Sequence, residues 1–258
     1  RGMMTARTLS SIELADDAAR KDIEGFNRTE VPYEDGVTVV DLFRRRAAEG
    51  PDATCLVYCD KRFTYSEVDG ITDRLAARIV SSGMKHGSVV GILIPRCEHM
   101  LLASLGVLKA GCAYLPLDPT YPEDRLNLMV KDSGACMLIT TPELDGIISD
   151  DFKGVRMMTD EIDSLASGTA DTDAVLPVLH PDDRFVILYT SGSTGVPKGV
   201  IFKHSNTMVT AAWEKRFYAL GPGCNVTAYA SFGFDANVFD TYATIISGAA
   251  LHIISDEI

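Results

Sequence analysis

The chain has 258 residues, of which 46% are hydrophobic and 23% are charged, and its formal net charge at pH 7 is −12. This composition predicts a globular protein with a core large enough for one or two domains. It argues against a nucleic-acid partner, because nucleic-acid binding needs a basic surface. The one basic run, Arg44-Arg45-Arg46, falls on a predicted helix and is interpreted as a solvated face of it.

Six cysteines occur without a Cys-x-x-Cys pair, and no group of cysteines and histidines has the spacing of a metal site. We therefore expect reduced thiols, a cytoplasmic location and no metal held by these residues. The most apolar long run, residues 100–117, is interrupted by Lys109, by glycines and by Pro116. It predicts a buried helix followed by a strand, so we expect no membrane partner.

Residues 1–36 are polar and acidic, with a helical pattern only around residues 12–23. We interpret them as an inter-domain linker arm, since Pro32 favours an extended connector. The chain begins with arginine and stops directly after a strand-like run at residues 249–254. These two features predict a piece of a longer polypeptide.

Strand-like and helical patterns alternate beyond the arm. Apolar runs predict strands at residues 53–59, 89–94, 113–116, 137–140, 155–158, 185–189, 199–202, 226–230 and 249–254. Amphipathic patterns predict helices at residues 38–48, 64–83, 98–109, 122–130, 205–220 and 235–246, the first two capped by Thr38 and Thr64. This alternation predicts an α/β fold with doubly wound, mostly parallel sheets and flanking helices. We divide it into a first α/β subdomain, residues 37–180, and the incomplete start of a second, residues 181–258.

The stretch from Thr190 to Gly199 joins two of the predicted strands. It is rich in small donors, namely the hydroxyls of Thr190, Ser191, Ser193 and Thr194, together with Gly192, Gly195, Gly199 and Lys198. Glycines let backbone N–H groups approach an anion, and lysine adds a positive charge, so we predict a phosphate-binding loop. The spacing differs from a Walker A loop, because Pro197 precedes the lysine. The alternative, a flexible linker, fits poorly between two apolar runs.

Two further stretches leave alternatives open. Residues 108–122 are consistent with a helix end, Gly111, a strand and a proline-bounded turn. Asp235 follows a predicted strand and is either the N-cap of the next helix or a carboxylate facing a ligand at the end of the sheet. His204, after the second strand of the loop region, either approaches the phosphates or has a structural role.

Four motifs occur in an order and spacing that resemble the adenylation domains of non-ribosomal peptide synthetases. These domains belong to the adenylate-forming enzymes, which include acyl-CoA ligases and luciferases. The motifs are Phe63-Thr-Tyr-Ser-Glu67-Val, residues 108–118, residues 188–199 and Phe234-Asp-Ala-Asn237, where Asn237 replaces the usual serine. The run Phe26-Asn-Arg-Thr-Glu30 resembles the linker that follows a condensation domain. The resemblance implies the N-terminal portion of the adenylate-forming enzyme fold.

The resemblance also implies a reaction in two halves. An amino-acid carboxylate attacks ATP to give aminoacyl-AMP and pyrophosphate, and the acyl group then passes to the phosphopantetheine thiol of a carrier domain. The implied cofactors are ATP and Mg²⁺, and the implied partners are the amino acid and the carrier and condensation domains of the same synthetase. The family's later motifs, which hold adenine, ribose and Mg²⁺, do not occur before Ile258. We therefore expect this chain to be inactive alone, with most Mg²⁺ ligands outside it.

The resemblance assigns roles to individual residues. The ATP phosphates would be bound by Thr190, Ser191, Gly192, Ser193, Thr194, Gly195 and Lys198, with Thr190 and Lys198 as catalytic residues. Lys198 would stabilise the charge that develops on pyrophosphate. Asp235 would pair with the substrate α-ammonium. Ala236 and Phe239 match positions that line the side-chain pocket, and because both are apolar they favour a hydrophobic, branched aliphatic amino acid.

Two competing functions remain. One is an adenylating enzyme of the CoA-ligase type that activates a fatty or aryl acid, against which Asp235 argues because such acids carry no ammonium group. The other is a non-catalytic scaffold that keeps the fold, against which the intact loop argues.

Overall fold

The computed structural model describes residues 15–168, 174–190 and 197–255. The chain divides into two units, residues 1–33 and 34–258. The described part of the first unit carries one helix, α1 (Asp17–Phe26), with none of its side chains buried. The helix begins at Asp17 because Asp16 is its N-cap and accepts a 2.8 Å hydrogen bond from the Ala19 N–H. The predicted helix in the arm is therefore present, at residues 17–26.

The second unit contains two sheets. The six-stranded sheet has the order β6-β5-β3-β4-β7-β8 and the four-stranded sheet the order β2-β1-β10-β9. The six-stranded sheet comprises β3 (Val89–Leu93), β4 (Ala113–Leu117), β5 (Met137–Thr140), β6 (Val155–Met158), β7 (Arg184–Thr190) and β8 (Lys198–Lys203). The four-stranded sheet comprises β1 (Thr54–Tyr58), β2 (Lys61–Thr64), β9 (Asn225–Ala228) and β10 (Ala250–Ile253). Neighbouring strands are parallel except in the β1–β2 and β7–β8 pairs.

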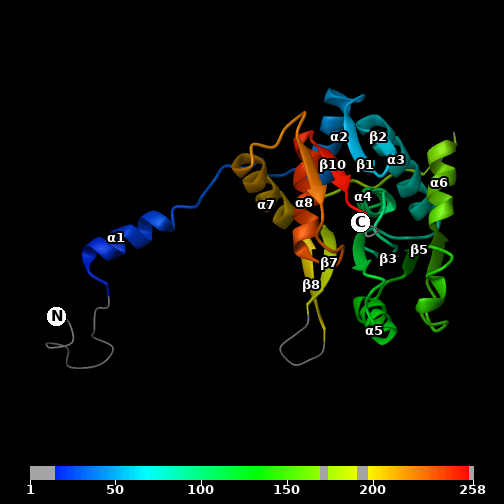
Figure 1. The fold of residues 1–258 in the computed structure, drawn as a ribbon. Coiled ribbons are helices and arrows are strands. Elements are labelled where there is room, and N and C mark those ends of the chain that lie inside the picture. The colour runs from blue at the N-terminus through cyan, green and yellow to red at the C-terminus, as the bar shows by residue number, and fades with distance from the viewer. Residues whose placement is uncertain (1–14, 169–173, 191–196, 256–258) are drawn as a thin grey trace, which may run out of the picture. The chain divides into compact units, whose positions relative to one another are not determined.

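Helices cover both faces of the six-stranded sheet. The helices described in the second unit are α2 (Val39–Glu49), α3 (Tyr65–Ser81), α4 (His99–Lys109), α5 (Glu123–Ser133), α6 (Thr159–Ser167), α7 (His204–Phe217) and α8 (Asp235–Ser247), with a 3-10 turn at Asp145–Ile147. Helix α4 lies between the two sheets, and every residue from Met100 to Lys109 is buried (Figure 1). Successive residues of β3 point to opposite cores, since Val90 packs on the α4 side and Val89 on the α5 side. The predicted α/β fold with mostly parallel sheets and flanking helices is confirmed.

The predicted boundary at residue 180 does not coincide with the sheets. Strands β7 and β8 extend the sheet that β3 to β6 begin, and β10 pairs in parallel with β1, which lies nearly the whole chain away. Alternating patterns predict where strands are, but the order of strands depends on packing between segments that are distant in sequence. Two elements, β2 and α6, are absent from the sequence predictions.

The β1–β2 pair is a tight hairpin between antiparallel strands. Cys59 lies in its turn with φ 50°, a left-handed conformation that is uncommon for a residue with a side chain. The turn carries neither glycine nor proline, which explains why the sequence did not predict a hairpin here.

No helix among the described residues combines the length and apolar character that a membrane crossing requires. Residues 100–117, the most apolar run, form α4 and β4, as predicted.

A buried ammonium group anchors α4 to α3. The Lys109 side chain is fully buried, and its Nζ donates to Asp69 Oδ1 at 2.5 Å, to Asp73 Oδ1 at 2.8 Å and to the Asp69 carbonyl at 2.9 Å. Burial lowers the pKa of Lys109, and the two carboxylates oppose that shift. Burial would raise the pKa of Asp73, but the charges of Lys109 and Arg44 outweigh it and lower this pKa. The Lys109 ammonium group therefore donates three hydrogen bonds, and these offset the cost of its desolvation.

We predict that Lys109→Met lowers the free energy of unfolding by on the order of 3 kcal/mol, because it removes the ion pair of Asp69 and leaves Asp73 with Arg44 alone. Lys131→Met is the matched control, since Lys131 is an exposed lysine on α5. Urea denaturation of both variants checks this. Equal effects of the two substitutions would contradict the assignment of Lys109 as an anchor.

Candidate functional site

The carboxyl ends of strands from both sheets meet in one place. Arg96, shortly after β3, donates from Nη1 to the carbonyl of Ala228 at 3.2 Å and to that of Tyr229 at 2.7 Å, where β9 ends. Asp118, directly after β4, accepts a 2.5 Å hydrogen bond from Ser231 Oγ on the segment that follows β9. In open α/β sheets ligands bind outside the carboxyl ends of the strands. This meeting point is therefore the candidate functional site.

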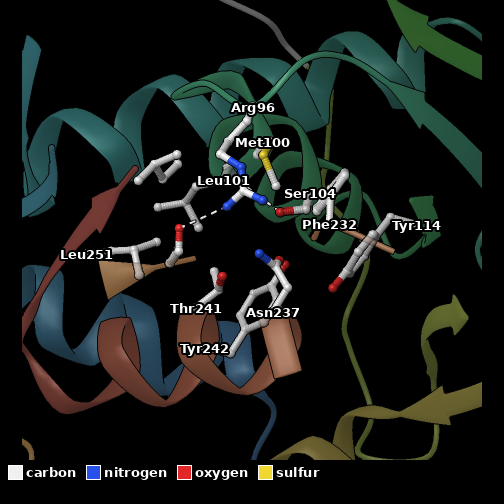
Figure 2. Close-up of a pocket in the computed structure, with 12 residues that line it drawn as sticks. Arg96, Met100, Leu101, Ser104, Tyr114, Phe232, Asn237, Thr241, Tyr242 and Leu251 are labelled. Atoms are coloured by element: carbon white, nitrogen blue, oxygen red, sulfur yellow. Dashed lines mark hydrogen bonds between the residues drawn. The ribbon is translucent and has the colours of Figure 1, made fainter. Parts of the chain in front are cut away.

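A small cavity lies beside this meeting point, between α4 and α8. Its enclosed volume is about 10 Å³, room for a single water molecule. Figure 2 shows the polar side chains that surround it, which are Arg96, Ser104, Tyr114, Asn237, Thr241 and Tyr242. An amino acid does not fit there. The predicted pocket residues Asp235, Ala236 and Phe239 do not line this cavity.

The predicted phosphate loop joins the two strands of a β-hairpin, β7 and β8. Thr190 ends β7, Lys198 begins β8, and the two residues are directly paired in the antiparallel ladder. Both are exposed. The other predicted phosphate ligands, Ser191, Gly192, Ser193, Thr194 and Gly195, lie outside the described residues. The structure thus places the two ends of the loop side by side at the carboxyl end of β7, which is parallel to β4.

A hydrogen bond fastens the loop end of this hairpin to α5. Tyr189 Oη donates to Asp132 Oδ2 at 2.6 Å, and burial together with this carboxylate raises the pKa of Tyr189. The Tyr189 ring packs under Gly199, where an added Cβ would lie 3.2 Å from the ring carbon Cζ. A side chain at position 199 would therefore require the Tyr189 ring to shift by a few tenths of an ångström. No sequence pattern marks Asp132 for this role, because a carboxylate near the end of an amphipathic helix resembles an ordinary solvated residue.

The segment between β9 and α8 is held on several sides. Asp118 also accepts hydrogen bonds from Thr120, at 3.0 Å from its N–H and 2.7 Å from its hydroxyl. Burial would raise the pKa of Asp118, but the hydrogen bonds from Ser231 and Thr120 outweigh burial and lower it. Asn237 Nδ2 donates to the carbonyl of Ala230 at 3.1 Å. The segment that leads into Asp235 is thus fixed by a side chain that follows β4 and by one on α8.

Asp235 is the first residue of α8, and its side chain does not serve as the N-cap. The N-cap residue is Phe234, which makes no side-chain capping bond. Asp235 Oδ1 accepts a 2.8 Å hydrogen bond from the N–H of the next residue, Ala236. The N-cap interpretation is therefore wrong. Asp235 and Ala236 are exposed, whereas Phe239 is half-buried and packs against the core.

His204 lies away from the loop. It follows the last residue of β8, whereas Lys198 is the first, so the two are separated by about 17 Å of strand. The imidazole is buried and packs edge-on against Phe185, with ring centroids 5.0 Å apart. Burial lowers the pKa of His204 to about 4. The interpretation that His204 approaches the phosphates is wrong, and its structural alternative is correct.

Two carboxylates on neighbouring helices are also perturbed. Burial, with a smaller contribution from the charge of Asp240, raises the pKa of Glu214 on α7 to about 7. Burial also raises the pKa of Asp240 on α8. No sequence pattern marks this pair, because the packing of α7 on α8 brings the two residues close. Among the described residues no group of histidine, cysteine, aspartate and glutamate side chains is arranged to hold a metal ion.

Comparison with known proteins gives consistent matches. The sequence profile described as AMP-binding enzyme matches residues 43–258. The chain is similar to a plipastatin synthase of Bacillus subtilis (strain 168), with 39% identity over 229 residues, covering 89% of this chain and 9% of that protein. It is also similar to bacitracin synthase 1 of Bacillus licheniformis, with 33% identity over 236 residues, covering 91% of this chain and 4% of that protein. The chain thus spans less than a tenth of these relatives.

Solved structures agree. The non-ribosomal peptide synthetase FmoA3 (S1046A) superposes with a TM-score of 0.83 and 27% identity, covering 92% of this chain and 25% of that one. The N-terminal subdomain of NpsA from Klebsiella oxytoca superposes with a TM-score of 0.73 and 24% identity, covering 86% of this chain and 54% of that one, which shows a shared fold. The resemblance drawn from the four motifs is confirmed.

We predict that His204 makes stability depend on pH. Its pKa is about 4 in the folded protein and 6.5 ordinarily, so between these values the unfolded chain binds a proton that the folded chain does not. Its contribution to the free energy of unfolding therefore falls with decreasing pH, by up to about 1.4 kcal/mol per pH unit. The measurement is urea unfolding of wild type and His204→Asn across this range. The wild type should lose stability relative to the variant as pH falls. A difference that stays constant would contradict the buried, neutral imidazole.

Proposed function

Because the chain belongs to the AMP-binding enzyme family, we propose that it is part of an adenylation domain that activates an amino acid. The amino-acid carboxylate would attack the α-phosphorus of ATP, forming aminoacyl-AMP and releasing pyrophosphate. The observation that carries the proposal is the meeting of the carboxyl ends of β3, β4 and β9 beside the β7–β8 hairpin. A related structure, FmoA3 (S1046A), has been solved in an AMPPNP-bound form and an alpha-methyl-L-serine-AMP-bound form.

The hairpin supplies the phosphate-binding role in this proposal. Thr190 and Lys198 face each other across the ladder, so a hydroxyl and an ammonium group would meet an anion bound at this end of the hairpin. Lys198 would stabilise the negative charge that develops as the bond between the α-phosphorus and the bridging oxygen breaks. Tyr189 and Asp132 would hold the hairpin in place for this role. Mg²⁺ would be held largely by residues outside this chain.

Asp235 supplies the amino-acid selectivity. Its exposed carboxylate, at the first position of α8, would pair with the substrate α-ammonium through a charge-assisted hydrogen bond. Ala236 and Phe239, on the same helix, would contact the substrate side chain. Both are apolar, so the substrate class is a hydrophobic, branched aliphatic amino acid.

The second half-reaction would move the acyl group to the phosphopantetheine thiol of a carrier domain. The thiol sulfur would attack the carbonyl carbon of aminoacyl-AMP and AMP would leave. The similar proteins are large synthases, of which this chain covers 4% and 9%. One fold neighbour is an artificially fused adenylation–PCP di-domain from Klebsiella oxytoca. We therefore infer carrier and condensation domains as partners in a cytoplasmic synthetase.

The competing substrate class is an aryl acid. NpsA, which shares the fold at 24% identity, was solved with 3-hydroxyanthranilyl-AMSN and 3-hydroxybenzoyl-AMSN. A 3-hydroxybenzoyl group carries no amine, so an anion at its binding site would be desolvated without a partner. The carboxylate of Asp235 at the start of α8 favours the amino acid.

We predict that Asp235→Ala, in the full-length protein, lowers amino-acid-dependent exchange of pyrophosphate into ATP at least tenfold, about the effect of one charge-assisted hydrogen bond. Asp182→Ala is the control, because Asp182 is an exposed carboxylate just before β7 whose partner is Lys203, the last residue of β8. Unchanged exchange in Asp235→Ala would refute amino-acid recognition by this residue.

We further predict that Lys198→Ala lowers the same exchange rate about 100-fold, because it removes a preorganised positive charge from the leaving pyrophosphate. Lys203→Ala is a matched control at the opposite end of β8. If Lys198→Ala exchanges as fast as Lys203→Ala, the non-catalytic scaffold becomes the better account.

A further inference from the structure

We propose that Asp118 is a positioning residue, whose carboxylate holds the segment 230–234 so that Asp235 points toward the substrate. The inference rests on the proposed function of Asp235. It concerns a residue that would touch neither the amino acid nor ATP and would act through Ser231.

The contact joins the two sheets. Asp118 directly follows β4 of the six-stranded sheet, and Ser231 follows β9 of the four-stranded sheet, 113 residues later in the chain. Pro119 comes next after Asp118 and fixes its own backbone φ. The two Thr120 donors bind Asp118 Oδ1, whereas Ser231 binds Oδ2. One carboxylate oxygen therefore accepts hydrogen bonds from its own turn, and the other accepts one from the segment that leads into α8.

The same segment is packed tightly on the turn after β4. An added Cβ at Gly233 would lie 3.1 Å from Tyr121 Oη, so the segment and this tyrosine are in close contact. The guanidinium carbon of Arg125 lies over the Tyr121 ring, 3.9 Å from its centroid, and so helps to hold the ring in place. The Phe234 N–H donates to the Ser231 carbonyl at 3.0 Å, closing a turn immediately before Asp235. Movement of Ser231 would therefore move the start of α8.

A charged acceptor suits this role. Hydrogen bonds to an ionised carboxylate are about twice as strong as those between neutral groups. The lowered pKa of Asp118 keeps it ionised at neutral pH. This bond would fix the position of the Asp235 carboxylate. A small displacement of that carboxylate would weaken its charge-assisted contact with the substrate and so weaken substrate binding.

The test compares Ser231→Ala and Asp118→Asn with the matched control Thr120→Val, which removes a hydrogen bond from the same carboxylate without touching segment 230–234. In the full-length protein, Ser231→Ala and Asp118→Asn should each raise KM for the amino acid about tenfold. KM for ATP should change less than about twofold, and Thr120→Val should change either constant by no more than that. Amide hydrogen exchange of residues 232–236 in the 258-residue chain should be faster in Ser231→Ala than in Thr120→Val.

The outcomes are separable. If exchange at residues 232–236 and KM for the amino acid respond equally to Ser231→Ala and Thr120→Val, the positioning role of Asp118 is overturned. A rise in KM for ATP as large as that for the amino acid would also overturn it, because it would show general damage. Suppose that amide exchange is faster in Ser231→Ala but that Asp235→Ala leaves the amino-acid-dependent pyrophosphate exchange rate unchanged. This result would support the fixing of segment 230–234 by Asp118 and would reject the proposed function of Asp235.

Discussion

Parallel pairing of strands is the constraint on which this structure depends. In both sheets it collects the carboxyl ends of strands along one edge, and there side chains that follow β3 and β4 bond to the end of β9 and to the segment after it. The backbone ladders build each sheet, but side chains make the junction between the sheets. Arg96 satisfies carbonyl groups where β9 ends, and Asp118 receives the hydroxyl of Ser231. A site at this edge therefore combines elements that are distant in sequence with a rigid base.

Buried charge is compensated by partners at two positions. Lys109 lies fully inside the protein and meets two carboxylates, and Asp118 meets three donors. His204 is buried as a neutral imidazole instead. Glu214 and Asp240 differ, because burial raises the pKa of both. Burial thus shifts both carboxylates toward the protonated form, and Asp240 lies on the helix that carries Asp235.

Local features of the fold could be predicted from sequence because they have local causes. The caps at Thr38 and Thr64 follow from hydroxyl and carboxylate residues three positions apart, and both capping boxes are present. Strands with continuous apolar runs, such as Met137–Thr140, were predicted at their observed bounds. The sheet order could not be predicted, since the pairing of β1 with β10 leaves no mark on either strand. The Asp235 cap was wrong because α8 starts one residue earlier than a capping aspartate would require.

The same distinction applies to the candidate site. Thr190, Lys198 and Asp235 were recognisable from motifs, and their roles remain proposals. Asp132 and Ser231 were not recognisable, because each gains its significance from a partner 57 or 113 residues away.

The central claim is that the carboxylate of an amino acid attacks the α-phosphorus of ATP. Its most direct test supplies the full-length protein with ATP, hydroxylamine as acyl acceptor and proteinogenic amino acids labelled with ¹⁸O in the carboxylate. The account predicts AMP carrying one ¹⁸O atom by mass spectrometry, whereas unlabelled AMP, or label in pyrophosphate, would contradict it.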